Sequence, residues 1–189
     1  MGIFFPNCSI PLFIKHIDDY DRWQFKLDNT KEFNKALWNF TPWIFEQWEK
    51  FFFTYDEGIH DNSLNLFYLE GKALLRDHNQ KVANMIKKAE KCVISTWSND
   101  SYGATYAGLA VNCPTFLTSD TGSELAKACG TFGLCWTFKI EDGKQIAACS
   151  LRSNGEYDVS DIAKIFGGGG HRNAAGFSVP ISTLLKWIK

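Results

Sequence analysis

Length, composition and charge narrow the functions open to this chain. It has 189 residues, of which 45% are hydrophobic and 22% are charged, and its formal net charge at pH 7 is −1. These values are typical of a globular protein with one domain and part of another, or with two small domains. Without a strong positive charge the chain is poorly suited to long nucleic acids. A short oligonucleotide, a dinucleotide or a small phosphoester suits it better.

Cysteine spacing and apolar runs indicate the compartment. The six cysteines show neither CxxC nor Cys/His ligand spacing. We therefore expect buried thiols in a reducing environment rather than a structural zinc site. No apolar run approaches the ~20 residues of a membrane-spanning helix, and the first residues lack the charged leader and long apolar core of a secretion signal. We expect a cytoplasmic protein.

Residues 1–60 are rich in aromatic side chains and predict short helices. A helix is expected over residues 31–39, and Pro42, at a first helical position, opens a second one that runs to about residue 53. Both helices carry apolar residues on most faces and must be buried on most sides. We expect residues 31–53 to be covered by self-association or by a separate polypeptide, unless the first residues and the second domain cover them.

The pattern then changes to one long helix followed by an α/β unit. Apolar residues at helical spacing predict a helix over residues 64–91. Further on, Asp142-Gly143 marks a hairpin turn. The order of elements predicts an α/β fold with a mixed sheet. The expected elements are strands over 92–97 and 104–111, a helix over 123–129, paired strands over 134–140 and 145–151, a helix over 160–166 capped by Ser160, a strand over 175–179 and a helix over 180–188.

The most informative segment is a run of glycines near the end of the chain. Glycine leaves backbone N–H groups unshielded, and successive unshielded amides can form a nest that binds a phosphate. The His and Arg that follow can add charged donors to the same anion. A flexible linker is the alternative, but structured sequence on both sides favours contact with a phosphate or nucleotide. The run comprises Gly167, Gly168, Gly169 and Gly170, followed by His171 and Arg172.

Two further residues extend this candidate site. Arg152 ends the second strand of the predicted hairpin, where its planar guanidinium can hold a phosphate or carboxylate through two hydrogen bonds. A solvated surface charge is the alternative interpretation of Arg152. Asn173, directly after the glycine run and its two basic residues, can read the edge of a base or a sugar.

Three carboxylates near the start of the chain form a second candidate site. Asp18, Asp19 and Asp21 lie within four positions of one another. Hard divalent cations such as Mg²⁺ or Mn²⁺ prefer oxygen ligands of this kind, and a two-metal phosphoesterase uses them to activate a water molecule. From the residues alone, a solvated acidic turn at a helix end is the better interpretation.

The motifs around these residues resemble a known family. The segments SLRS at 150–153, VSDIA at 159–163 and GGGGHRNAAGF at 167–177 resemble, in residues and spacing, the C-terminal substrate-binding domain of the DHH phosphoesterases. That domain is called the DHH-associated domain of type 1. Upstream, TGSELA at 121–126 resembles one of its helix starts, EGKALLR at 70–76 resembles the linker helix, and IDDYDRW at 17–23 resembles the last acidic motif of the catalytic domain.

This resemblance implies an organisation in three parts. Residues 1–60 would be the C-terminal remnant of a DHH-type catalytic domain, residues 61–91 a linker helix, and residues 92–189 the substrate-binding domain. The resemblance implies substrate contacts through Arg152, the glycine run and His171. It also implies metal contacts, to Mn²⁺ or Mg²⁺, through Asp19 and Asp21.

The triplet that names the family is missing from this chain. Its histidines are His16, His60, His78 and His171, and no two are adjacent. The family's earlier acidic motifs also have no counterpart before Asp18. The resemblance therefore implies the C-terminal portion of a phosphohydrolase that binds short oligonucleotides, dinucleotides or similar phosphoesters, and that hydrolyses them only with ligands from a separate polypeptide. Two alternatives stay open: a non-catalytic nucleotide-binding module or regulator, and a truncated frame with no role of its own.

Overall fold

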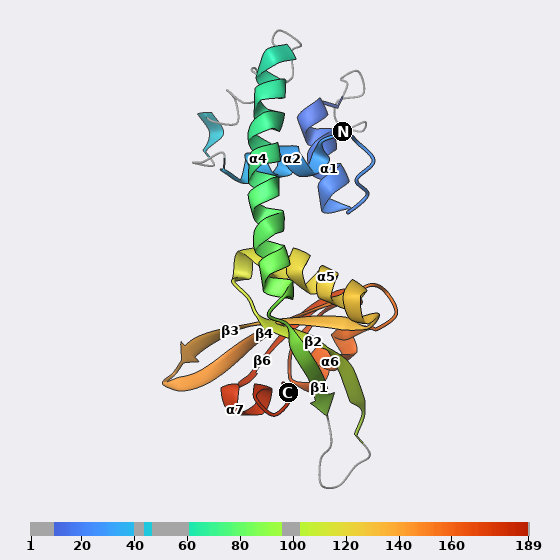
Figure 1. The fold of residues 1–189 in the computed structure, drawn as a ribbon, viewed down its shortest axis with the longest axis vertical. Coiled ribbons are helices and arrows are strands. Elements are labelled where there is room, and N and C mark those ends of the chain that lie inside the picture. Colours follow the sequence, from blue (N-terminus) through green and yellow to red (C-terminus); the bar gives the residue numbers. More distant parts are fainter. Residues whose placement is uncertain (1–9, 40–43, 47–60, 96–102, 189) are drawn as a thin grey trace. The chain divides into compact units, whose positions relative to one another are not determined.

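The computed structural model describes residues 10–39, 44–46, 61–95 and 103–188 (Figure 1). The chain divides into two compact units, Met1–Asn79 and Gln80–Lys189, and the boundary falls inside the long helix α4 (Asp61–Ile86). The helix predicted over residues 42–53 lies outside the described residues except for 44–46. The three-part division implied by the resemblance stays a prediction.

The first unit packs α1 (Leu12–Asp21), α2 (Thr30–Asn39) and the first part of α4 around an aromatic core. Phe33 of α2 is fully buried, and its ring centroid lies 5.2 Å from that of Phe67 on α4. Helix α2 confirms the prediction over residues 31–39. Helix α1 was not predicted, because two of its inward-facing residues, His16 and Asp19, are polar and interrupt the apolar spacing.

The second unit is built on a six-stranded mixed sheet, which confirms the predicted fold class (Figure 1). The strands lie in the order β1-β2-β3-β4-β6-β5. Strands β2 and β3 pair in parallel across η1 (Thr115–Leu117) and α5 (Thr118–Cys129), and the other described neighbours are antiparallel. The strand bounds are β1 (Glu90–Ser95), β2 (Thr105–Asn112), β3 (Phe132–Glu141), β4 (Lys144–Ser153), β5 (Gly169–His171) and β6 (Ala174–Pro180).

Alternate residues of the strands belong to two cores, one on each face of the sheet. On β3, Leu134 lies in the larger core together with α6 (Val159–Ile165) and α7 (Ile181–Leu184). The next residue, Cys135, lies in a smaller core with α5 and the end of α4. This alternation follows from the pleat of a strand. One face of the sheet is therefore the α5 face and the other carries α6 and α7.

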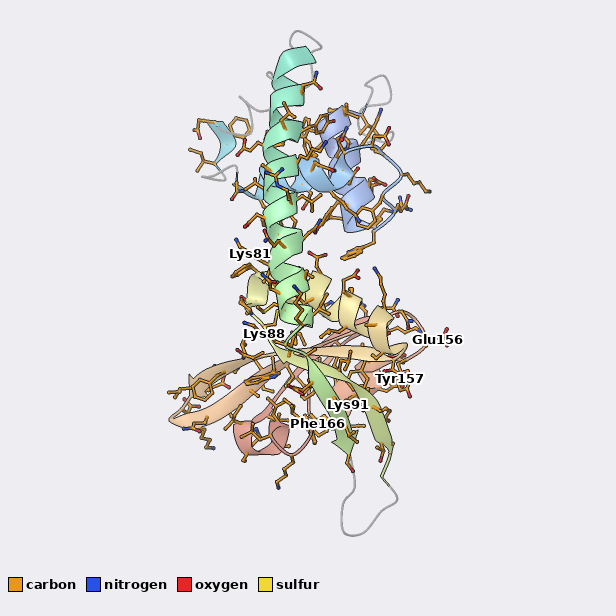
Figure 2. The ribbon with its side chains drawn as sticks, in the orientation of Figure 1. Lys81, Lys88, Lys91, Glu156, Tyr157 and Phe166 are labelled. Atoms are coloured by element: carbon orange, nitrogen blue, oxygen red, sulfur yellow. The ribbon has the colours of Figure 1, made fainter. Side chains whose placement is uncertain are left out.

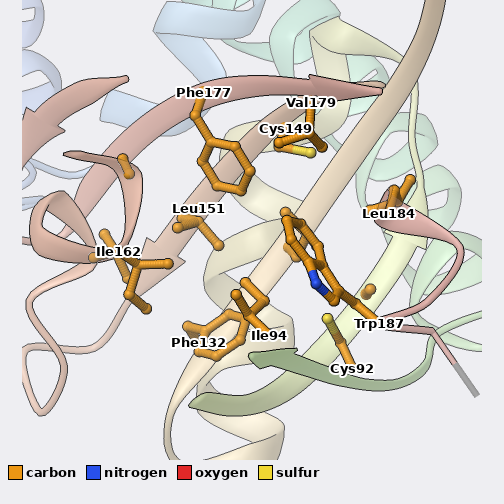
Figure 3. Packing of buried hydrophobic residues seen from close by; sticks show 14 of the residues in the cluster. Cys92, Ile94, Phe132, Cys149, Leu151, Ile162, Phe177, Val179, Leu184 and Trp187 are labelled. Atoms are coloured by element: carbon orange, nitrogen blue, oxygen red, sulfur yellow. The ribbon is translucent and has the colours of Figure 1, made fainter. Parts of the chain in front are cut away.

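The larger core holds the second unit together (Figure 3). Phe132, Leu151 and Ile162 are fully buried within it. Tyr157 and Phe166, labelled in Figure 2, flank α6 in the sequence and pack against this core. Full burial of a large apolar side chain stabilises a fold by about 1.5–3 kcal/mol, so this core fixes α6 and the segment that follows it.

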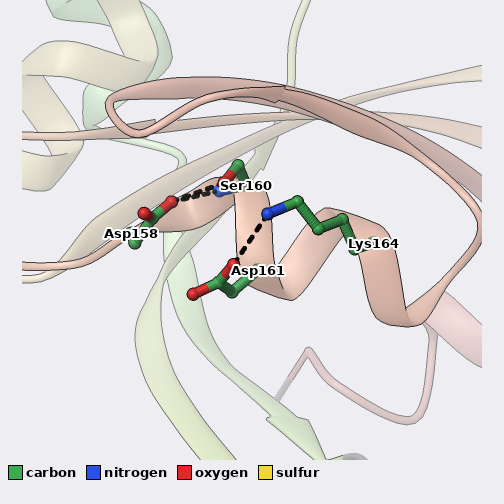
Figure 4. Close-up of polar contacts among 4 residues, drawn as sticks. All are labelled: Asp158, Ser160, Asp161 and Lys164. Atoms are coloured by element: carbon green, nitrogen blue, oxygen red, sulfur yellow. Dashed lines mark hydrogen bonds and ion pairs between the residues drawn. The ribbon is translucent and has the colours of Figure 1, made fainter.

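Several boundaries differ from the sequence prediction for local reasons. Helix α4 ends at Ile86 rather than at residue 91, because β1 already begins at Glu90. Helix α6 is capped by Asp158 rather than by Ser160: Asp158 Oδ1 accepts a hydrogen bond from the Ser160 N–H at 3.0 Å (Figure 4). Helix α7 stops at Leu184, and Ile188 instead forms a β-bridge with Cys92.

The hairpin of β3 and β4 confirms its predicted turn. Asp142 and Gly143 have φ values of 49° and 73°. Two consecutive positive φ values are what the favoured two-residue hairpin turn requires, and an Asp-Gly pair adopts them readily. Each strand is longer than predicted.

The described cysteines are free thiols, as the sequence predicted. Cys92, Cys113, Cys135 and Cys149 are buried, and Cys129 is half-buried. Burial raises the pKa of Cys92 and of Cys149 to about 12, so these two thiols stay protonated and unreactive. In the part of the chain that the structure describes, no helix combines the length and apolar character needed to cross a membrane. The cytoplasmic location stays a prediction.

Candidate functional site

The first two glycines of the run end helix α6. Gly167 has a φ of +75°, and its N–H donates to the carbonyl oxygen of Lys164 at 3.1 Å. The N–H of Gly168 donates to the carbonyl oxygen of Ala163 at 2.9 Å. This pair of hydrogen bonds is the Schellman motif, which favours a left-handed glycine. Two of the four amides that the sequence assigned to a phosphate nest therefore bond to the helix.

The other two glycines belong to a short strand, β5 (Gly169–His171), that the sequence did not predict. It pairs antiparallel with β6, with Gly170 opposite Ala175. A side chain at Gly168 would overlap the carbonyl oxygen of Gly176. The lack of side chains thus lets this segment lie close against β6. The run is part of a hairpin rather than a free loop.

The turn of this hairpin is tied to its surroundings. The carbonyl oxygen of Asn173 accepts a hydrogen bond from the Ser153 N–H at 3.1 Å, and that of Arg172 accepts one from the Val159 N–H at 2.9 Å. The side chains of His171, Arg172 and Asn173 are exposed. They therefore face solvent from a turn whose backbone is fixed to the end of β4 and the start of α6.

Strand register brings Arg152 and His171 onto the same face of the sheet. Arg152 of β4 lies opposite Ala174 of β6, and Ala174 lies opposite His171 of β5. Residues directly opposite each other in antiparallel strands point to the same face. Two strand spacings, about 10 Å, separate the Cα atoms of Arg152 and His171. The guanidinium and imidazole that the sequence assigned to one site therefore share one row of the sheet.

The side chain of Arg152 is held against the first part of α5. Its Nη2 donates to Ser119 Oγ at 3.0 Å, and its Nη1 donates to the Leu151 carbonyl oxygen at 2.9 Å. Burial lowers the pKa of the guanidinium from its ordinary value. Because a guanidinium carries five N–H donors, it keeps donors for an oxyanion after these two bonds are made.

Sequence reasoning missed the residues that support Arg152. Gly122 lies on α5, where a Cβ would come within 2.9 Å of Arg152 Cγ, so the missing side chain makes room for the arginine. A glycine in a helix is disfavoured and signals close packing, which would have identified Gly122. No local sequence signal marks Ser119, because its hydrogen-bond partner Arg152 lies 33 positions later in the sequence.

The two carboxylates proposed as metal ligands, Asp19 and Asp21, point in different directions. Asp19 is only 5% exposed, whereas Asp21, two positions later on α1, is exposed. Both carboxylate oxygens of Asp19 accept hydrogen bonds from the loop after α1. Oδ1 accepts from the Lys26 N–H at 2.9 Å, and Oδ2 from the Leu27 N–H at 3.1 Å. The structure does not bring Asp19 and Asp21 together.

The described residues do not fit the metal centre that the resemblance implies. Over 10–39, 44–46, 61–95 and 103–188, no three His, Cys, Asp or Glu side chains are grouped so that they could hold a metal ion. Asp18 is engaged in an exposed ion pair with Arg22 at 3.5 Å. Mn²⁺ or Mg²⁺ needs several oxygen ligands, so such a centre would need ligands from beyond these residues.

Comparisons with a family model, with other protein sequences and with solved structures each find a match. Residues 123–188 match the family model described as DHHA1 domain, a range that includes Arg152 and the glycine run. The chain is 35% identical over 178 residues to an uncharacterized protein of Acanthamoeba polyphaga mimivirus, a match that covers 93% of this chain and 38% of that protein. A solved pGpG-specific phosphodiesterase of Vibrio cholerae is 13% identical, with a TM-score of 0.48, over 94% of this chain and 65% of that one. The chain thus spans less than two thirds of either protein.

Proposed function

Since residues 123–188 of this chain form a DHHA1 domain, we propose that the protein binds the phosphate groups of short oligonucleotides, dinucleotides or similar phosphoesters on the α5 face of its sheet. Arg152 and His171 are the proposed charged donors. The exposed side chain of Asn173 is the proposed contact to a base or sugar. Of the backbone N–H groups of Gly169 and Gly170, one is used in the pairing with β6 and the other remains a candidate donor, whereas Gly167 and Gly168 shape the hairpin.

The shared row of Arg152, Ala174 and His171 is the observation that carries this proposal. The small side chain of Ala174 leaves room between the two larger ones. Arg152 is held in place by Ser119, so little side-chain entropy is lost when it binds an anion. Guanidinium groups bind phosphate with charge-assisted and frequently bidentate hydrogen bonds.

For turnover we propose a dependence on metal ligands from another polypeptide. The chain contains no Asp-His-His triplet, and its described residues do not fit a metal centre. A separate DHH-domain polypeptide would supply what is missing, and residues 31–53 would be covered by that polypeptide or by self-association. Within that segment the side chain of Phe45 is 76% exposed, which supports the proposal that another polypeptide or a second copy of the chain packs on it.

A non-catalytic binding module is the second candidate function. Arg152, Ser119, His171 and Asn173 all lie in the second unit, Gln80–Lys189. The proposed binding residues therefore all belong to one compact unit. Such a module would sequester a nucleotide or regulate a relative that carries the full set of metal ligands.

Calorimetric titration of the full chain tests the binding proposal. The probes are a 5′-phosphorylated dinucleotide and a short single-stranded RNA, each with and without Mn²⁺. We expect Arg152→Ala or His171→Ala to weaken binding by about 1–3 kcal/mol, which is roughly 5- to 150-fold in Kd. Arg22→Ala is the charge-matched control, because its exposed guanidinium pairs with Asp18 on α1. Equal affinity of the unsubstituted chain and both site variants would overturn the assignment.

A further inference from the structure

Phe116 is an exposed aromatic residue of the second unit that the proposed function does not use. It lies in η1, between the end of β2 and α5, and it is 72% exposed. The next residue, Leu117, is buried in the smaller core on the α5 face. In the described part of the chain, no other aromatic ring and no cation packs against the ring of Phe116. The ring is therefore available to a ligand.

The position of Phe116 matters more than its exposure, because single exposed apolar residues are common on protein surfaces. The other exposed large hydrophobic residues described in this unit belong to the face that carries α6 and α7, where Leu134 lies in the larger core. They are Phe138 and Ile140 of β3, Ile165 of α6 and Leu185 directly after α7. Among the described residues, Phe116 is thus the exposed large hydrophobic side chain of the α5 face.

Helix geometry places Phe116 beside the residue that anchors Arg152. The chain stays helical from η1 into α5, since Thr118 has φ and ψ values of −56° and −44° and its N–H donates to the Thr115 carbonyl oxygen. Side chains three positions apart lie on the same side of such a helix, about 6 Å apart. Phe116 therefore neighbours Ser119, whose Oγ accepts the hydrogen bond from Arg152 Nη2 at 3.0 Å.

Arg152 lies between the helix and the outer strands of the sheet. Helix α5 packs on β3 and β4, whereas β6 and β5 continue the sheet on the other side of β4. A phosphate on Arg152 would have Phe116 and Ser119 on one side and the exposed His171 on the other. Since a nucleotide carries its base one sugar away from its phosphate, a base on the α5 side comes within reach of the Phe116 ring.

We propose that Phe116 is a stacking surface for a base of the nucleotide whose phosphate binds Arg152, an inference that rests on the proposed function. It narrows the ligand from phosphoesters in general to those that carry a base. Every base has a π-face, so stacking on an aromatic ring tolerates any sequence and discriminates only by stacking strength.

Calorimetric titration of the full chain with two matched probes tests the stacking. One probe is a 5′-phosphorylated dinucleotide with two adenine bases, and the other is the same backbone without bases. Stacking of one base on an aromatic side chain is worth roughly 5- to 150-fold in Kd. In Phe116→Ala we expect the Kd of the adenine probe to rise by that factor, while the Kd of the abasic probe stays unchanged.

Two further variants are the controls for this substitution. Phe116→Tyr keeps an aromatic ring and should bind the adenine probe like the unsubstituted chain. Phe138→Ala removes an exposed phenylalanine from the opposite face of the sheet and should change neither Kd. Unchanged affinity of Phe116→Ala for the adenine probe, or an equal loss for both probes, would overturn the proposal.

Arg152→Ala separates a failure of the stacking from a failure of the proposed function. We expect it to weaken the binding of both probes. If it weakens the abasic probe while Phe116→Ala leaves the adenine probe unchanged, the phosphate site stands and only the stacking is wrong. If the abasic probe is insensitive to Arg152→Ala, the phosphate site is wrong and the stacking proposal falls with it.

Proton magnetic resonance of the bound adenine probe gives a readout that does not depend on affinity. Protons above the face of an aromatic ring shift upfield. We expect the adenine protons to shift upfield on the unsubstituted chain and to lose this shift on Phe116→Leu, which keeps an apolar side chain without a ring. The same upfield shift on both proteins would contradict stacking on Phe116. This comparison also decides the proposal when Phe116→Ala does not fold.

Discussion

Arg152 and His171 face the same side of the sheet, two strands apart, with the methyl group of Ala174 between them. The guanidinium is anchored to Ser119 on α5, whereas the imidazole is exposed at the turn of a hairpin. A ligand on this face would meet a donor anchored to α5 on one side and an exposed donor on the other. Ala174 is therefore the residue of β6 that lies between these two donors.

Filling that space is expected to block the site without removing a charge. Ala174→Val adds two methyl groups between Arg152 and His171, while valine suits a strand well. We expect stability to be retained and the Kd for a 5′-phosphorylated dinucleotide to rise at least about tenfold, which is about 1.4 kcal/mol. Calorimetry measures the affinity and urea unfolding measures the stability.

Ser178→Val is the control for this substitution. Ser178 lies on the same strand and, four residues further along, on the same face, but it pairs with Ala148 instead of Arg152. It should leave the Kd unchanged. Equal affinity of the Ala174→Val and Ser178→Val proteins would show that ligand does not occupy the row.

Alanine substitutions in the glycine run are expected to have unequal effects on stability. Gly167→Ala puts a side chain in the left-handed region, at a cost of about 1–2 kcal/mol. Gly168→Ala meets the Gly176 carbonyl oxygen and should be worse. Gly169→Ala meets no atom within 4 Å and should be neutral. Thermal or urea unfolding of the three variants gives the comparison, and three equal effects would contradict the hairpin geometry.

Much of the second unit could be predicted from local sequence. The Asp142-Gly143 turn between apolar runs gives the β3–β4 hairpin because both residues tolerate positive φ. Strand β5 could not be predicted in this way, because glycine has little preference for strands. It is a strand because β6 supplies its backbone partners. Nor could the row of Arg152 and His171 be predicted, since it depends on the register of three strands.

The first unit was harder to predict, because its helix α1 buries polar side chains. His16 bonds with Thr30, 14 positions away, and with Tyr68, 52 positions away. From the local sequence alone, the polar residues His16 and Asp19 are expected on the surface. Only their distant partners make burial favourable, since buried polar groups must be hydrogen-bonded. The Asp19 carboxylate thereby forms part of the packing of this unit.

Acid unfolding should report this role of Asp19. Burial alone would raise the pKa of its carboxyl, but hydrogen bonds from Lys26, Thr30 and Leu27, with the charge of His16, lower it from the ordinary 3.8. A lowered pKa means that this stabilisation is complete above 3.8 and is lost as pH falls through the folded value. We expect Asp19→Asn to be less stable near neutral pH and to lose less stability on acidification. Urea unfolding over a pH series measures both effects.

Asp21→Asn is the matched control on the same helix. Asp21 is exposed, and surface substitutions of this kind change stability by less than about 0.5 kcal/mol. The control should follow the unsubstituted chain at every pH. An Asp19→Asn protein that also follows it would show that the loop bonds contribute nothing.

The purified chain alone is expected to show no Mn²⁺-dependent phosphodiesterase activity. Two-metal hydrolysis needs ligands that hold both ions and activate water. Both carboxylate oxygens of Asp19 accept hydrogen bonds from the loop after α1, and Asp21 is exposed whereas Asp19 is buried. Chromatography of a dinucleotide incubated with the chain and Mn²⁺ measures turnover. The same preparation must bind the dinucleotide by calorimetry, so that lack of product reflects missing chemistry and not an unfolded protein. Product formed at a rate that survives purification to homogeneity, and is abolished by Arg152→Ala, would show that this chain holds a complete catalytic centre.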